Sequence, residues 1–245
     1  GAAVRRLQGR KRLLFRAAAS LINGLVNAGE VPLGPQPLSA PALANLRRRD
    51  SRGVALPGLV LVGSHVPLAD AQLAELLKDG RCAALELPVA RIARVLEGGT
   101  PDLLLADLER AWGEYLQGCL AQGRTPVLYT SRGELTFGEG ASAQRRRLQF
   151  GLALAQLTAR LVAACAPQLG YVISKGGITT GTLLAEGLAL DAVQLEGQLL
   201  PGLSLVRPWV PAGLPWHDLP IVTFPGNLGD RNTLHQVWCC MERAM

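Results

Sequence analysis

The stretch GYVISKGGITTG, at residues 170–181, decides which fold this chain is expected to adopt. Its first half, Gly170–Ser174, is a short apolar run, which is typical of a buried strand. Two glycines follow, and hydroxyl residues then open a predicted helix over Ile178–Leu188. A strand that turns through glycines into a helix is the building unit of a parallel sheet. The stretch therefore predicts an α/β fold.

The same alternation of strand and helix extends along the chain on both sides of this stretch. Predicted strands lie at Leu59–Val62, Ala83–Leu87, Thr125–Tyr129, Ala192–Leu195, Leu203–Val206 and Ile221–Phe224. Predicted helices lie at Pro67–Lys78, at Asp102–Leu120 with Thr100 as its cap, at Ala141–Cys165 and at Asn232–Glu242. We expect a three-layer α/β domain whose mainly parallel, Rossmann-like sheet is flanked by helices, with a strand-rich C-terminal part.

The first fifty residues have a different pattern. Helical periodicity covers Arg10–Asn27, and closely spaced prolines then predict a linker over Val31–Pro41. We therefore expect two regions: residues 1–50, a helix and a proline-rich linker, and residues 51–245, a complete domain.

Composition excludes several classes of protein. The chain has 245 residues, 49% of them hydrophobic and 18% charged, so it can build a core without disulfides. Polar residues interrupt its longest apolar stretch, Leu148–Ala166, so we expect no membrane span and no membrane partner. The five cysteines form no CxxC pair and the three histidines lie apart from them, which predicts free thiols, a reducing cytoplasm and no metal site.

The formal net charge of +6 favours anionic partners: nucleic acid, membrane headgroups or phosphorylated metabolites. Arginines gather within residues 5–16 and at Arg145–Arg147. Aromatic residues make up 4% of the chain and do not interleave with these clusters, so the stacking platforms that hold bases are missing. Solvated helix faces explain both clusters better than nucleic-acid binding does.

Three loops that follow predicted strands carry small residues. Gly63-Ser64 offers close backbone approach and a hydroxyl donor, although such a turn is also common without a ligand. Gly176-Gly177 opens a helix, and exposed N–H groups at a helix start attract anions, with Lys175 directly before them. This loop is neither a Walker A sequence nor GxGxxG, and a plain turn capped by Thr179 or Thr180 fits it equally well.

The third loop, Pro225–Asp230, needs the positive backbone angles that glycine and asparagine supply. Asp230 fits a helix cap better than a metal ligand or a base. Because the carboxyl ends of parallel strands meet at one edge, the three loops together predict a cleft of backbone donors suited to a nucleotide. No catalytic set accompanies them, since His65 is the lone histidine in these loops. Residue patterns therefore predict a nucleotide- or phosphate-binding α/β domain.

Six segments in this order resemble the carboxyl-terminal nucleotide-binding domain of the four-carbon acid sugar kinase family. They are FRAAAS at 15–20, VGS at 62–64, YTSR at 129–132, SKGGITT at 174–180, GQLLPG at 197–202 and FPGNLGD at 224–230. In that family an amino-terminal domain binds the acid sugar and the carboxyl-terminal domain binds ATP, whose phosphoryl group passes to a hydroxyl of a tetronate-type acid with Mg²⁺.

The resemblance implies roles for named positions. The nucleotide-binding residues would be Ser64, Gly176, Gly177, Ile178, Thr179 and Gly226, and further candidate phosphate contacts are Lys175, Thr180 and Asn227. The catalytic residues stay unassigned. The partners implied are ATP, the acid sugar through the other domain, and a second copy of the chain in a homodimer.

The sequence departs from the family pattern at two places. The Asp-Asp-x-Thr-Gly signature of the acid-sugar domain has no counterpart, so the chain is expected to be the carboxyl-terminal half of a longer protein and inactive by itself. Residues 1–50 are then expected to be left from the preceding substrate-binding domain, and residues 51–245 to be the nucleotide-binding domain. Leu203-Ser204-Leu205 stands where the family has a Val-Pro pair. The alternative function is a non-catalytic module that binds a nucleotide or phosphorylated metabolite and regulates a partner.

Overall fold

The computed structural model describes residues 2–7, 9–15, 37–99, 101–133, 136–210 and 213–243. The chain divides into two units, Gly1–Pro37 and Leu38–Met245, which are described separately. In the first unit, α1 covers Ala2–Leu7 and residues 11–15 have no regular structure. The helix predicted over Arg10–Asn27 is therefore wrong for its first residues, and the rest of it lies outside the described residues.

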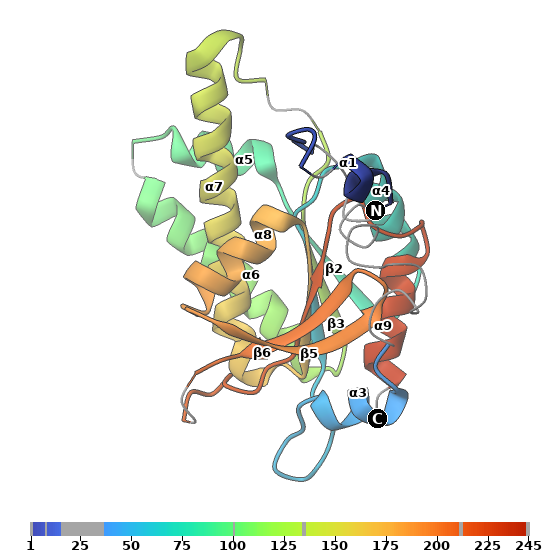
Figure 1. Cartoon of the computed structure of the whole chain (residues 1–245). Coiled ribbons are helices and arrows are strands. Elements are labelled where there is room, and N and C mark those ends of the chain that lie inside the picture. The colour runs from blue at the N-terminus through green and yellow to red at the C-terminus, as the bar shows by residue number, and fades with distance from the viewer. Residues whose placement is uncertain are drawn as a thin grey trace. The chain divides into compact units, whose positions relative to one another are not determined.

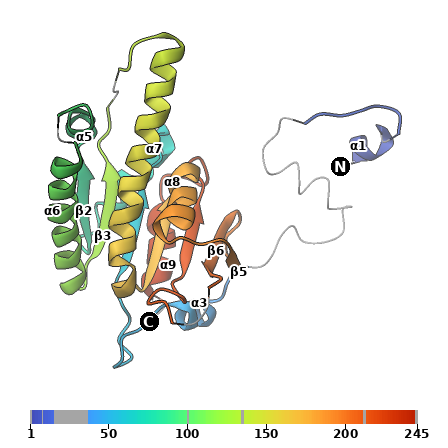
Figure 2. The ribbon, with the colours of Figure 1, turned by 90° about the vertical axis from the view of Figure 1, so that its left-hand side faces the viewer.

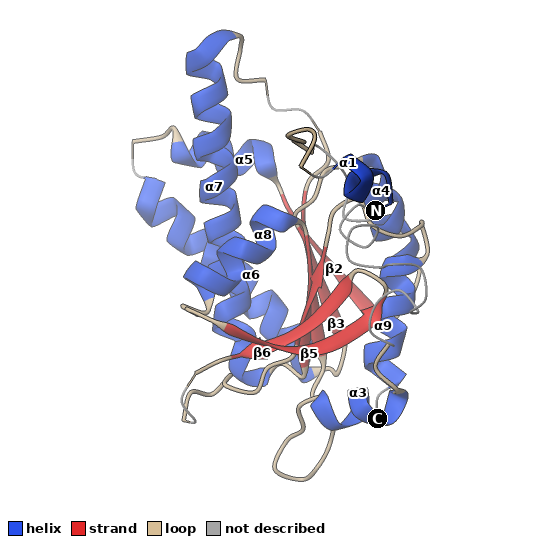
Figure 3. Cartoon of the chain, in the orientation of Figure 1, coloured by secondary structure: helices blue, strands red, loops and turns tan. Residues whose placement is uncertain are grey.

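The second unit contains a seven-stranded sheet in the order β2-β3-β1-β4-β7-β6-β5 within the described part of the chain (Figure 3). The strands are β1 (Gly58–Val62), β2 (Cys82–Leu87), β3 (Thr125–Thr130), β4 (Tyr171–Lys175), β5 (Val193–Leu200), β6 (Leu203–Pro208) and β7 (Ile221–Phe224). The pairs among β2, β3, β1, β4 and β7 are parallel, whereas β6 and β5 are antiparallel additions at the β7 side. The mainly parallel sheet with a strand-rich C-terminal part is confirmed.

Helices cover both faces of this sheet (Figure 1). One layer contains α5 (Val89–Leu96), α6 (Pro101–Ala121), α7 (Gly140–Cys165) and α8 (Gly177–Thr182), which continues as a π-helix over Leu183–Gly187. The other layer contains α3 (Ala40–Leu46), α4 (Pro67–Leu76) and α9 (Thr233–Arg243). Figure 2 shows α7 running along the sheet beside α8, and α7 also contacts α6. The predicted three layers are confirmed.

Alternate residues of the central strands enter different cores. In β1, Leu59 and Leu61 pack with α5, α6 and α7, while Val60 and Val62 pack with α4 and α9. Every residue of β1 and β4 is buried, as expected for strands that are covered on both faces. This alternation also fixes the face toward which each residue at the strand ends points.

Two α-helices of the second unit were missed by the sequence interpretation, as was α1 in the first unit. The first, α3, begins in the last two residues of the predicted linker. The side chain of Ser39 accepts a hydrogen bond from the Ala42 amide there, and Pro41 occupies the first turn, a position that tolerates proline. Residues 38–50 thus lie in the second unit, and their assignment to a preceding domain stays a prediction. The other missed helix, α5, is short, but its apolar residues Val89, Ile92 and Leu96 recur at helical spacing, so this signal was available in the sequence. The predicted cap Thr100 lies outside the described residues.

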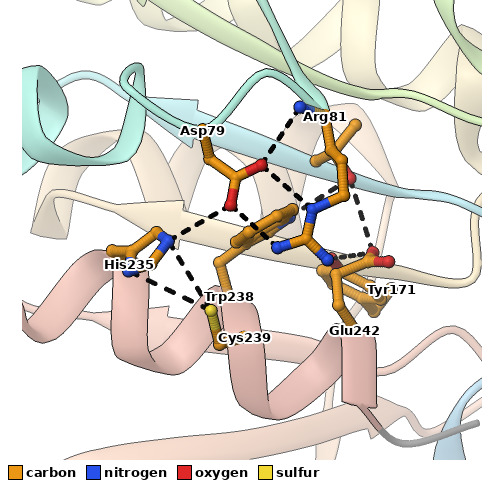
Figure 4. Close-up of polar contacts among 8 residues, drawn as sticks. Asp79, Arg81, Tyr171, His235, Trp238, Cys239 and Glu242 are labelled. Carbon is orange, nitrogen blue, oxygen red and sulfur yellow. Dashed lines mark hydrogen bonds and ion pairs between the residues drawn. The ribbon is translucent and has the colours of Figure 1, made fainter.

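A polar network anchors α9 at the amino ends of the strands (Figure 4). Arg81 bonds to both carboxylate oxygens of Asp79 and stacks over the Trp238 ring, with 4.5 Å from its guanidinium carbon to the ring centroid. The Tyr171 hydroxyl donates to Glu242 Oε1 at 2.6 Å. Because this network lies at the edge away from the strand-end loops, its contribution is to the stability of the fold.

The long helix α7 departs from the expectation that no segment could span a membrane. Residues Gly140–Gln168 are long and apolar enough to do so by length and composition alone. Its second half, however, packs into the core of the sheet through buried residues such as Leu157, Leu161 and Val162. A core helix therefore explains this apolar stretch within the described fold.

All five cysteines are free.

Candidate functional site

The three loops predicted to bind phosphate meet at one edge of the sheet. Val62 pairs with Lys175, and Lys175 pairs with Phe224, so β1, β4 and β7 end at the same level. Beyond these ends the loops remain joined, since the Gly63 amide donates to the Lys175 carbonyl at 3.0 Å and the Gly176 amide to the Phe224 carbonyl at 2.9 Å. Parallel pairing thus brings together segments that lie far apart in the sequence.

Glycines make this junction possible. A methyl group on Gly63 would overlap Oγ1 of Thr179, and one on Gly226 would overlap Oγ of Ser64. Gly176 has a φ of +125° and lies so close to Ser64 that an added Cβ would be 3.2 Å from the Ser64 nitrogen. Each loop therefore contacts another through a position that has no side chain.

The second glycine of the central loop has a different environment. Gly177 is exposed, has an ordinary backbone conformation, and would direct a Cβ into open space. Ile178, the next residue, is 70% exposed. Gly177 and Ile178 start α8, so their N–H groups belong to the first turn of this helix, whose donors have no partner within the helix.

Lys175 points away from this open space. Its side chain is fully buried, its Nζ donates to the Pro225 carbonyl at 3.1 Å, and Nζ lies 3.8 Å from the centroid of the Phe224 ring. Burial lowers the pKa of Lys175 from 10.5 to about 8. These contacts link the amine to the third loop, and a contact between Lys175 and phosphate stays a prediction.

The two hydroxyl residues at the start of α8, Thr179 and Thr180, differ in the contacts that their hydroxyl groups already make. Thr180 Oγ1 lies 2.8 Å from Ser174 Oγ and 3.0 Å from the Ser174 carbonyl oxygen, so its hydroxyl is already engaged. Thr179 is buried against Gly63 and lines the cavity described below. Asn227 is exposed in the third loop. The phosphate contacts assigned to these residues stay predictions.

Asp230 is placed as a helix-start residue. Its Oδ1 accepts from the Asn232 amide at 2.8 Å and from the Thr233 hydroxyl at 3.0 Å, where α9 begins. These hydrogen bonds, that from Asn232 first, lower the pKa of Asp230. The arrangement agrees with the interpretation of Asp230 as a cap.

A group that the sequence interpretation did not assign surrounds Ser64. Arg132, which follows β3, donates to the Ser64 carbonyl at 2.7 Å and lies 3.0 Å from Asp70 of α4. Arg132 Nη2 is buried without a hydrogen-bond partner among the described residues. His65 Nε2 lies 2.8 Å from Thr130 Oγ1, and partial burial, followed by the charge of Arg132, lowers the pKa of His65. Thr130 and Arg132 lie at the end of a predicted strand, and this position could have identified them as candidate site residues from the sequence.

A cavity of about 810 Å³ adjoins the loops on the α7 side. Gly63, His65 and Thr130 line it beside the strand ends, and Ile178 and Thr179 line it from the start of α8. The rest of its lining comes from α7, from Ala141 to Thr158. Two of the arginines interpreted as a solvated helix face, Arg145 and Arg147, line it. This volume lies within the range of small-molecule sites, about 300–1,000 Å³.

The described residues offer no ready-made metal site. Among them, no group of three or more His, Cys, Asp or Glu side chains is close enough together to hold an ion. The side-chain oxygens at the loop junction include the hydroxyls of Ser64 and Thr179. A cation at this edge would therefore depend on oxygen atoms supplied by an anionic ligand.

Comparisons with known proteins agree with this geometry. A family model described as a nucleotide-binding C-terminal domain matches residues 59–234, which include all three loops. No curated protein sequence matches the chain significantly.

Similar solved structures include a domain of unknown function, DUF1537, from Bordetella bronchiseptica, a domain-swapped dimer with bound citrate. It has 21% identity and a TM-score of 0.58, with 77% of this chain and 41% of that chain covered. A DUF1537 protein from Haemophilus influenzae has 16% identity and a TM-score of 0.51, with 77% and 40% covered. At these identities the similarity shows the fold, and this chain spans about 40% of the length of the structures it matches.

Proposed function

This chain belongs to the family of nucleotide-binding C-terminal domains carried by DUF1537 proteins, the four-carbon acid sugar kinase family, and we propose that its ligand is ATP. The observation that carries the proposal is the meeting of Gly63, Gly176 and Gly226 at one sheet edge. Glycines at such a junction let backbone N–H groups approach phosphate oxygens closely.

The proposed contacts are those that the family resemblance implies. Gly176, Gly177, Ile178 and Thr179 hold the phosphates at the start of α8, where exposed N–H groups and the helix dipole favour negative charge. Ser64 and Gly226 approach from the flanking loops, and Lys175, Thr180 and Asn227 are the secondary candidates. Support comes from the open space above Gly177 and from the exposure of Ile178.

We further propose that the complete protein transfers the γ-phosphoryl group of ATP to a hydroxyl of a four-carbon, tetronate-type acid. The acid sugar would bind to a second domain, because this chain spans about 40% of the structures it matches. Phosphoryl transfer depends chiefly on positioning and on neutralisation of charge, which backbone donors and arginines supply. Mg²⁺ would arrive with the nucleotide, since phosphate oxygens are its usual ligands in such sites.

Two further properties complete the proposal. The Bordetella structure is described as a domain-swapped dimer, which supports a homodimer for the complete protein. Free thiols at all five cysteines support a reducing compartment, for which we propose the cytoplasm.

Isothermal titration of the chain with Mg²⁺-ATP and Mg²⁺-ADP tests the proposal. Heat of binding is expected for the wild type and loss of it for Gly177→Val, whose side chain would occupy the open space above the loops. Gly118→Val on α6 is the matched control, because Gly118 is also an exposed helical glycine with nothing within 4 Å of an added Cβ.

Both variants are expected to keep the unfolding temperature close to that of the wild type. No heat from the wild type at millimolar nucleotide would refute ATP binding. Normal binding by the Gly177→Val variant would refute the assignment of the site to the α8 loop.

A further inference from the structure

The wall of the cavity formed by α7 carries large apolar side chains that the fold leaves exposed. Leu148 and Leu152 line it from α7 and Ile178 faces it from α8, with 70%, 45% and 70% of their surfaces exposed. The N-terminal half of α7, which holds Leu148, extends past the carboxyl edge of the sheet (Figure 1). Exposed apolar residues gathered in a cavity of this size indicate a ligand with an apolar body.

A glycine in the same wall, Gly151, is required neither by its backbone conformation nor by close packing. Gly151 lies in the interior of α7, where glycine destabilises a helix relative to alanine. Its backbone conformation is ordinary for a helix, and an added Cβ would meet no atom within 4 Å. Gly151 lines the cavity between Leu148 and Leu152. The missing side chain leaves space beside α7 in which a planar group of a ligand could lie against the helix.

The cavity is continuous with the proposed phosphate loops. Gly63, Ile178 and Thr179 belong both to the loop junction and to the cavity lining. Arg145 and Arg147 also line the cavity, and their charges suit a ligand that carries phosphates. A ligand anchored by phosphates at the start of α8 could therefore place its remaining part against α7.

We propose that the α7 cavity holds the nucleoside part of the nucleotide. The heteroaromatic base lies over Gly151, between the Leu148 and Leu152 side chains of α7 and Ile178 of α8. This inference rests on the proposed function, because it requires the phosphates to occupy the loop junction. It assigns to α7 a role in holding the base, whereas the three loops hold the phosphates.

The test compares a ligand with a base to one without. Titrate the wild type, Gly151→Leu and Gly118→Leu with Mg²⁺-ADP and with inorganic tripolyphosphate. The Gly151→Leu side chain would fill the space above the helix, so the affinity for ADP is expected to fall about tenfold or more. The affinity for tripolyphosphate should stay within about twofold of the wild type. Gly118→Leu should leave both affinities unchanged.

Leu148→Ser provides a second probe that removes apolar contact without filling the cavity. The Leu148→Ser variant should have a several-fold lower affinity for ADP and an unchanged affinity for tripolyphosphate. Unchanged ADP affinity in both α7 variants would overturn the base site while ATP binding itself stands. Equal weakening of both ligands would also overturn it, because the phosphates would then lie beside Gly151. A wild type that binds neither ligand would overturn the proposed function and the base site together.

Discussion

The buried amine of Lys175 makes a quantitative prediction about stability and pH. Its side chain is fully buried, with one hydrogen bond to the Pro225 carbonyl and the Phe224 ring beneath it. Because the pKa falls from 10.5 to about 8 on folding, the unfolded state holds this proton more tightly than the folded state does. Below pH 8 the amine is charged in both states, and its burial destabilises the fold.

The size of this effect follows from the pKa shift. A shift from 10.5 to about 8 corresponds to about 3 kcal/mol. As the pH rises from below 8 to above 10.5, the free energy of unfolding of the wild type should therefore increase by about 3 kcal/mol relative to that of a Lys175→Met variant. At pH 7 the variant should be the more stable protein. Its advantage should be about 1 kcal/mol smaller than the pH-dependent effect, because the variant also loses the hydrogen bond to the Pro225 carbonyl.

Urea unfolding of the wild type and Lys175→Met at pH 7, 8, 9 and 10 measures this difference. Other groups titrate in this range, but they are common to both proteins and cancel when the two free energies of unfolding are subtracted. A difference that does not change with pH would refute the reasoning, since it would mean that Lys175 keeps its ordinary pKa in the folded protein.

Two further substitutions test the packing of the fold. Tyr171→Phe removes the hydroxyl that donates to Glu242 at 2.6 Å, and should lower the free energy of unfolding by about 1–3 kcal/mol in urea titrations while nucleotide affinity is unchanged. A loss of affinity there would contradict the separation of this network from the strand-end loops. In the Gly63→Ala variant the added methyl group would overlap Thr179, so urea titration should show a free energy of unfolding lower by about 1–3 kcal/mol. Isothermal titration should also show a weaker affinity for ADP. An unchanged affinity for ADP would show that the loop junction is not part of the site.

Local sequence patterns determined most of the sheet. The mainly apolar run Ile221–Phe224, in which only Thr223 is polar, has the same bounds in the prediction and in the structure, because strands covered on both faces consist largely of apolar residues. The glycine-containing loops were identifiable for a related reason, since each follows such a run. By contrast, α3 buries only Leu43, and tertiary packing rather than periodicity stabilises it. The apolar residues of α5 do recur at helical spacing, so that helix was predictable from the sequence.

The sequence by itself determined that Ser64, Gly176 and Gly226 belong to strand-end loops. Only the tertiary structure decided their neighbours, because parallel pairing joins segments that lie far apart in the chain. It also decided the direction of Lys175, which strand alternation turns toward Phe224 and away from the α7 cavity. The α7 wall with Gly151 depends on the register of that helix against the sheet, which packing sets and which no local pattern records.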